Sequence, residues 1–224
     1  MTASRIIDLR KLLAERFPQE SLPPTGRLVT GLPIFDETLE GGLTKGAITE
    51  LTSASGNAGS ATIIAALLQR AGRDRFFIAL IDGRDSFDPA TSGGSDGSAL
   101  SHLLWVRCRK ATEAMQAADL LLRDGNFPLV ILDLVLNPVE ELRKIPQTHW
   151  YRLQRLVEPA PTAFLVLTPR NMISSAQWKL ALENRWALPQ LDAETCALAA
   201  RLKIRLQRAQ PNKWRNDPGI AQAV

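Results

Sequence analysis

The chain has 224 residues, 45% of them hydrophobic, and its 27 basic and 23 acidic residues give a net charge of +4. This length allows one complete buried core, so no second domain is needed, and so small a net charge does not by itself indicate nucleic acid as a partner. Cys108 and Cys196 lack the spacing of a metal site or a disulfide framework. No apolar run is long enough to span a bilayer, and no secretion signal is recognisable. We therefore expect a cytoplasmic protein without a metal site or a membrane contact.

Residues 1–24 are predicted to form a separate unit, made of a helix and a proline-containing linker. Pro18 ends the helix, and Pro23 with Pro24 stiffens the linker. Four apolar residues recur on one face of the helix: Ile6, Leu9, Leu13 and Phe17. This face has to cover something, either its own domain or a neighbouring subunit or partner, and both interpretations stay open.

Short apolar runs alternate with helical patterns along residues 25–210. Helices are predicted at residues 61–70 and 111–123, and a surface loop rich in Gly, Ser and Asp at residues 85–98. The runs predict strands at residues 47–51, 76–81, 103–106, 129–132, 163–167 and 202–206. The first five are almost continuously apolar, as in strands covered on both faces. We expect a doubly wound α/β domain with a mostly parallel sheet, followed by a flexible tail at residues 211–224.

Residues 52–62 stand where a P-loop ATPase would carry its phosphate-binding loop. Such a loop needs a lysine after its second glycine to reach the β and γ phosphates, and a hydroxyl for magnesium. If Gly59 is that glycine, Ser60 takes the lysine position. Shifting the frame by one residue makes Thr62 the magnesium hydroxyl but puts an alanine at the lysine position, and residues 46–109 contain no lysine. The sequence thus predicts a phosphate loop without its cation.

The residues around this loop resemble the core of the RecA recombinases. Thr30-Gly31, an apolar-Asp helix, a Gly-Gly-Leu turn at residues 41–43 and Gly46 occur in that order before the first core strand. Residues 80–89 look like the segment that ends the second core strand of RecA, and residues 130–133 look like its Walker B strand. The resemblance covers residues 27–209 and implies a RecA-like fold.

Several departures from this family bear on catalysis. The family's general-base glutamate corresponds here to Arg84, which cannot accept a proton. Asp133 matches the Walker B carboxylate that helps hold magnesium, although an aspartate at the end of a strand can equally cap the next turn. Residues 168–170 replace the glutamine with which RecA senses the γ-phosphate. Without the lysine and the base we expect no useful ATP hydrolysis and no cofactor.

Some anion-binding capacity remains in the loop. Backbone amides at a helix start attract phosphate groups, which leaves a weak affinity for ATP or phosphate open. The amides concerned belong to Gly56, Gly59 and Ser60.

A RecA-like domain with an eroded nucleotide site is similar to the ImuA family of bacterial damage-induced mutagenesis. This resemblance implies work in translesion synthesis under the SOS response, beside an ImuB-like protein related to Y-family polymerases and an error-prone C-family polymerase. It also implies contact with RecA. We therefore expect a non-catalytic accessory protein in DNA repair. The alternatives are an atypical DNA-dependent ATPase, in which Lys45 or an arginine of a neighbouring subunit supplies the cation, and a regulator that caps RecA filaments or inhibits cell division.

Basic segments near the end of the chain are the candidates for contact with single-stranded DNA or a protein partner. Residues 201–206 alternate basic and apolar side chains, which can track phosphates or protect a sheet edge. Residues 170–189 combine basic residues with Trp178 and Trp186, a mixture that suits single-stranded DNA, although packing in the core also explains the tryptophans. The candidate residues are Arg170, Lys179, Arg185, Arg201, Lys203, Arg205, Arg208 and, in the tail, Trp214.

Overall fold

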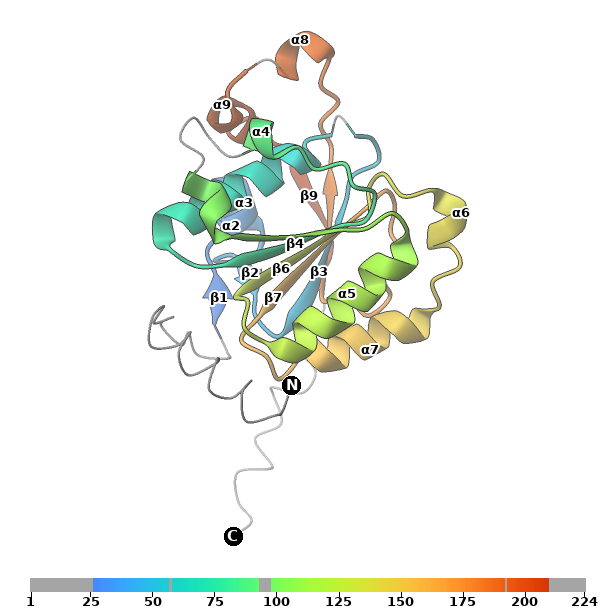
Figure 1. Ribbon diagram of the computed structural model, residues 1–224. Helices are drawn as coiled ribbons and strands as arrows, with labels where there is room; N and C mark the ends of the chain where they lie inside the picture. Colours follow the sequence, from blue (N-terminus) through green and yellow to red (C-terminus); the bar gives the residue numbers. More distant parts are fainter. Residues whose placement is uncertain (1–25, 57, 93–97, 192, 210–224) are drawn as a thin grey trace.

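The computed structural model describes residues 26–56, 58–92, 98–191 and 193–209. The expected leading helix and the expected tail lie outside these residues, and with them the candidate contacts Ile6, Leu9, Leu13, Phe17 and Trp214. The described part is an α/β fold in which helices cover both faces of one central sheet (Figure 1).

The central sheet has seven strands in the order β5-β4-β6-β7-β3-β8-β9. The strands are β3 (Ala47–Thr52), β4 (Ile78–Asp82), β5 (Leu103–Arg107), β6 (Leu129–Asp133), β7 (Ala163–Thr168), β8 (Trp178–Leu182) and β9 (Ile204–Ala209). Only β9 at one edge runs antiparallel to its neighbour. A small antiparallel pair, β1 (Arg27–Leu28) and β2 (Leu43–Thr44), precedes the sheet. The predicted mostly parallel α/β architecture is confirmed.

Helices form a layer on each face of the sheet (Figure 1). One layer contains α2 (Pro33–Thr38) and α3 (Ser60–Asp74), and the other contains α5 (Ala111–Asp124) and α7 (Gln147–Val157). Short elements complete the described chain: α4 (Pro89–Ser92), the 3-10 turn η1 (Ser98–His102), α6 (Val139–Leu142), α8 (Leu188–Leu191) and α9 (Thr195–Ala199).

Each layer encloses its own apolar core, because successive side chains of a strand point to opposite faces. In β7, Phe164 packs with Trp150 and the other residues of the α5 and α7 layer, whereas Leu165 packs with Leu67 and the α3 layer. Strands β3, β4 and β7 are buried along their whole length. Burial on both faces explains why these strands read as continuous apolar runs.

Two features of the sheet differ from the prediction. Strand β8 was not predicted, because Lys179 interrupts its apolar pattern. Strand β9 begins at Ile204, two residues later than expected. The Asn184 side chain explains this delay, since it donates to the carbonyl of Arg201 and accepts from the backbone N–H of Lys203, which holds these residues in a turn before the strand.

The carboxyl ends of β4 and β6 mark a reversal in the topology. The chain leaves β4 toward β5 at one edge of the sheet, whereas it leaves the adjacent β6 in the opposite direction, toward β7. Open α/β sheets bind ligands outside the carboxyl ends of their strands at such a reversal. Asp82 and Asp133, the last residues of β4 and β6, lie side by side there. This end of the sheet therefore contains the candidate site.

Candidate functional site

The segment expected to be a phosphate loop does join a buried strand, β3, to the helix α3. The Ser53 N–H donates to the carbonyl of Thr168 at 2.8 Å, which fixes the start of the loop to β7. Gly59 precedes α3 with a left-handed backbone, at φ 107°. Ser60, which takes the lysine position, and Thr62, the candidate magnesium hydroxyl, are both buried.

Apolar side chains fill the space beside Gly59. A Cβ atom at this position would lie 2.8 Å from the Leu202 Cδ2 atom and 3.1 Å from the Cη2 atom of Trp186. Both residues come from the region between β8 and β9, and both are buried. A side chain here would be excluded by this contact as well as by the positive φ. The packing therefore accounts for the glycine without a phosphate.

The other glycine of the loop lies in a more open place. Gly56 is exposed, and its nearest neighbour is the Leu136 side chain, 3.7 Å from where a Cβ atom would lie. Leu136 follows β6 and is itself 53% exposed. Apolar groups thus approach the loop from the β6 side as well as from the β9 side.

Asp82 organises the turn after β4, a role that the sequence did not indicate. Its buried carboxylate accepts hydrogen bonds from the backbone N–H groups of Ser86 and Phe87, each at 2.7 Å, and of Arg84 at 3.2 Å. Three donors satisfy most of the acceptor capacity of this carboxylate. The Asp-Gly pair at the end of an apolar strand was the available signal for such a turn.

Arg84, which the resemblance to RecA aligns with a general-base glutamate, points toward the edge of the sheet. Its Nη1 atom donates to the carbonyl of Arg109, just beyond the edge strand β5, at 3.1 Å. Because β6 and β7 lie between β4 and β3, about 14 Å separates the strand before Arg84 from the strand before the phosphate loop. The described side chain is therefore turned away from the loop.

The crevice between β4 and β6 is closed by Asn137. The amide of this buried residue donates to the Gly83 carbonyl at 2.8 Å, and its Oδ1 atom would lie 2.4 Å from a Cβ atom on Gly83. The Gly83 N–H donates to the Asp133 carbonyl at 2.9 Å. These contacts join the two turns at the reversal point, where an open sheet would receive a ligand.

Asp133 caps the turn after β6. Its Oδ1 atom accepts from the backbone N–H of Val135 at 3.0 Å. Desolvation, opposed by the Val135 hydrogen bond and reinforced by the nearby Asp82 charge, raises the pKa of Asp133 to about 6. This contact is the structural role that the sequence left open beside magnesium binding.

A buried ion pair fixes the segment that follows β7. Glu50, in the middle of β3, is fully buried, and its Oε2 atom lies 3.1 Å from the Nζ atom of Lys179 on β8. Its other oxygen accepts from the backbone N–H groups of Met172 at 2.7 Å and Ile173 at 3.1 Å. The carboxylate thus joins β3 to β8 and holds the chain after Thr168-Pro169-Arg170 against β3.

This ion pair changes the interpretation of Lys179. Lys179 was a candidate contact for DNA, but only 12% of its side chain is exposed. The Trp178 side chain beside it donates from Nε1 to Thr44 at 3.0 Å, and Trp186 lies in the same core. The basic and aromatic mixture around β8 is thus largely internal.

The remaining candidate cations differ in their exposure. Arg205 is exposed but pairs with Glu183 at 2.5 Å, and Arg170 is half-buried. A bulge in the pairing of β8 with β9 interrupts the regular alternation of the strand. The other exposed cations of this group are Arg185, Arg201, Lys203 and Arg208.

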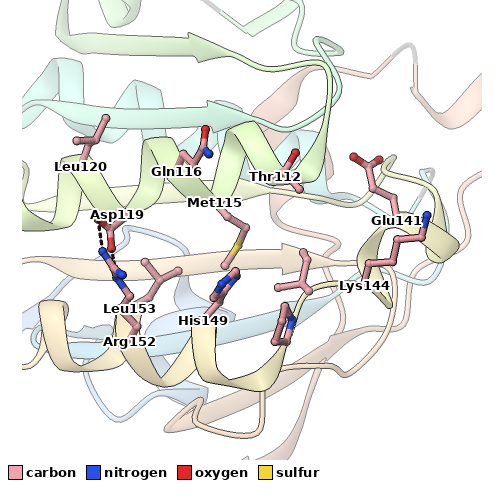
Figure 2. Close-up of a pocket in the computed structure, with 12 residues that line it drawn as sticks. Thr112, Met115, Gln116, Asp119, Leu120, Glu141, Lys144, His149, Arg152 and Leu153 are labelled. Carbon is pink, nitrogen blue, oxygen red and sulfur yellow. Dashed lines mark hydrogen bonds and ion pairs between the residues drawn. The ribbon is translucent and has the colours of Figure 1, made fainter.

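A groove between α5 and α7 is a second candidate site (Figure 2), on the other side of the sheet from α3 (Figure 1). It has a volume of about 580 Å³, and Met115, Ile145 and Leu153 give it apolar walls. At its rim Asp119 forms ion pairs at 2.7 Å with both Arg152 and Arg123. The sequence did predict the helix α5, at residues 111–123, but no signal indicated a groove beside it.

The fold and these sites define the class of the protein as an α/β protein with a mostly parallel seven-stranded sheet. Models of known protein families give no match to the chain, and no curated protein matches it either. Within the described ranges, no cluster of three or more His, Cys, Asp or Glu could hold a metal ion. Within the same ranges, no helix is both long and apolar enough to cross a membrane.

Proposed function

We propose that this protein is a non-catalytic RecA-like accessory protein, similar to the ImuA family, that works in damage-induced mutagenesis by binding partners. One observation carries this proposal most: Trp186 and Leu202 fill the space beside Gly59, in a loop that has no lysine. Phosphoryl transfer depends on positioned charge around the phosphates. A loop that lacks the lysine and packs against apolar side chains can stabilise the fold but is poorly suited to ATP hydrolysis.

The alternative of an atypical ATPase loses its internal source of charge. Lys45 lies just before β3, whereas the loop follows the other end of this strand, about 20 Å away at the rise of a β-strand. Lys45 is also buried, and its desolvation lowers its pKa. Of the two sources considered for the cation, an arginine of a neighbouring subunit is the one that stays open.

Partner binding has a suitable surface in the groove between α5 and α7. Leu120 at its edge is 68% exposed, and an apolar groove with a charged rim suits one face of an amphipathic helix. The proposed partners are an ImuB-like protein, an error-prone C-family polymerase and RecA, with single-stranded DNA as an additional ligand.

A hydrolysis assay tests the proposal. Phosphate release should be measured with ATP and magnesium, with and without single-stranded DNA, for the wild type and Asp133→Asn. We expect no turnover above background and no difference between the two proteins, because the lysine and the base are both missing. Turnover that DNA stimulates and that Asp133→Asn removes would favour the ATPase instead.

A further inference from the structure

Three arginines converge where β4 and β5 end, at the edge of the sheet farthest from β9. Arg107 is the last residue of β5 and pairs in register with Asp82 of β4. Arg109 follows it, and the Arg84 guanidinium donates to the Arg109 carbonyl at 3.1 Å. Asp85, Arg107 and Arg109 line a hollow of about 290 Å³ there. None of these arginines was a candidate for DNA contact in the sequence.

The Arg107 guanidinium is held in a fixed orientation. Its Nε and Nη2 atoms donate to the two carboxylate oxygens of Asp85 at 2.6 and 2.8 Å. Its Cζ atom also lies 4.9 Å from the centre of the Trp105 ring. The Trp105 ring in turn packs edge to face against the Phe87 ring, with 5.3 Å between the ring centres. A guanidinium fixed in this way loses little conformational entropy when it binds a ligand.

Positive charge is in excess around the hollow. The Asp85 carboxylate is engaged by Arg107, and Glu113 accepts from the Arg109 backbone N–H at 2.9 Å. Arg84, Arg109 and Lys110 are exposed, and none of the three forms an ion pair with a carboxylate within the described part of the chain. Their charges are therefore available to an anionic ligand.

The geometry points to a site for the phosphate groups of single-stranded DNA, formed by Arg84 and Arg109 beside the Asp85-bound Arg107 at the ends of β4 and β5. Planar guanidinium groups match the oxygens of a phosphate in two-point contacts. The cluster is compact and offers few contacts, which suits two or three successive phosphates of one strand better than the long track of a duplex. This inference extends the DNA-binding part of the proposed function, and it assigns that part to the edge opposite the basic residues before β9.

The test compares two double variants with the same change in charge. Binding of a labelled oligo-dT 20-mer is measured by fluorescence anisotropy for the wild type, Arg84→Glu/Arg109→Glu, and the control Arg73→Glu/Arg155→Glu, whose sites are exposed on α3 and α7. We expect the site variant to bind about tenfold more weakly or worse, and the control to stay within about twofold of the wild type. In a salt titration, the slope of log Kobs against log salt should become shallower by about 1.4 in the site variant, since each lost phosphate contact contributes about 0.7.

The other outcomes overturn the inference in distinguishable ways. If the two double variants weaken binding equally, the effect is one of general charge. If DNA binds and the site variant is unaffected, the DNA site lies elsewhere and the proposed function stands. If wild type binds no DNA while its protein partners still bind, only the DNA-binding part of the proposed function is lost. If polyglutamate competes as well as unlabelled oligo-dT at equal charge, the cluster is a surface for an acidic protein.

Discussion

Lys179→Met should lower the free energy of unfolding by about 3–5 kcal/mol, because it leaves the buried Glu50 carboxylate without its cation. Glu50 is fully buried, and the Lys179 ammonium lies 3.1 Å from its Oε2 atom. Urea denaturation followed by circular dichroism measures this loss. The matched control is Lys110→Met at an exposed lysine, which should change the stability by less than about 0.5 kcal/mol.

A double-mutant cycle separates the ion pair from the packing around it. In Glu50→Gln/Lys179→Met both charges are gone, so the loss should be clearly smaller than the sum of the two single losses. The backbone N–H groups of Met172 and Ile173, which donate to Glu50 in the wild type, can still donate to the amide oxygen of the substituted side chain. Strict additivity, or a loss below about 1 kcal/mol for Lys179→Met, would contradict a buried pair that holds the segment after β7.

Trp186→Ala should cost about 3–5 kcal/mol of stability, because it removes a large buried side chain and leaves a cavity beside Gly59. Trp186 is 7% exposed, and its ring contacts the position at which a Gly59 side chain would lie. Thermal or urea unfolding of the full chain measures the effect. Trp186→Phe is the control, since it keeps an aromatic ring in the same place and should cost clearly less.

The same variant also tests whether space beside Gly59 is enough to permit ATP hydrolysis. Because Trp186→Ala opens space but adds no cation, we expect the variant to show no ATP hydrolysis. Unfolding curves that coincide with the wild type would show that the ring does not contribute packing at this position.

The fold was predictable from the sequence where burial is two-sided. Strands such as β4 and β6 read as apolar runs because both of their faces are covered. Strand β8 was missed because Lys179 breaks the pattern, and the reason for a lysine there is Glu50, which belongs to a distant part of the chain. A local pattern cannot contain a pairing of this kind.

The sequence predicted which catalytic groups the candidate site lacks, but not which side chains pack there. The missing lysine and the arginine at residue 84 are visible in the sequence. The packing of Trp186 and Leu202 against Gly59 is not, because it depends on how the turn before β9 returns to α3. The cluster around Arg107 likewise forms only when β4 and β5 lie side by side.

The central claim is that the loop before α3 is a packed junction and not a nucleotide site, and titration of a fluorescent ATP analogue with magnesium tests it most directly. The filled space beside Gly59 and the absence of a lysine in the loop predict no saturable binding up to millimolar concentration. Saturable binding in the micromolar range that Asp133→Asn abolishes would contradict the claim.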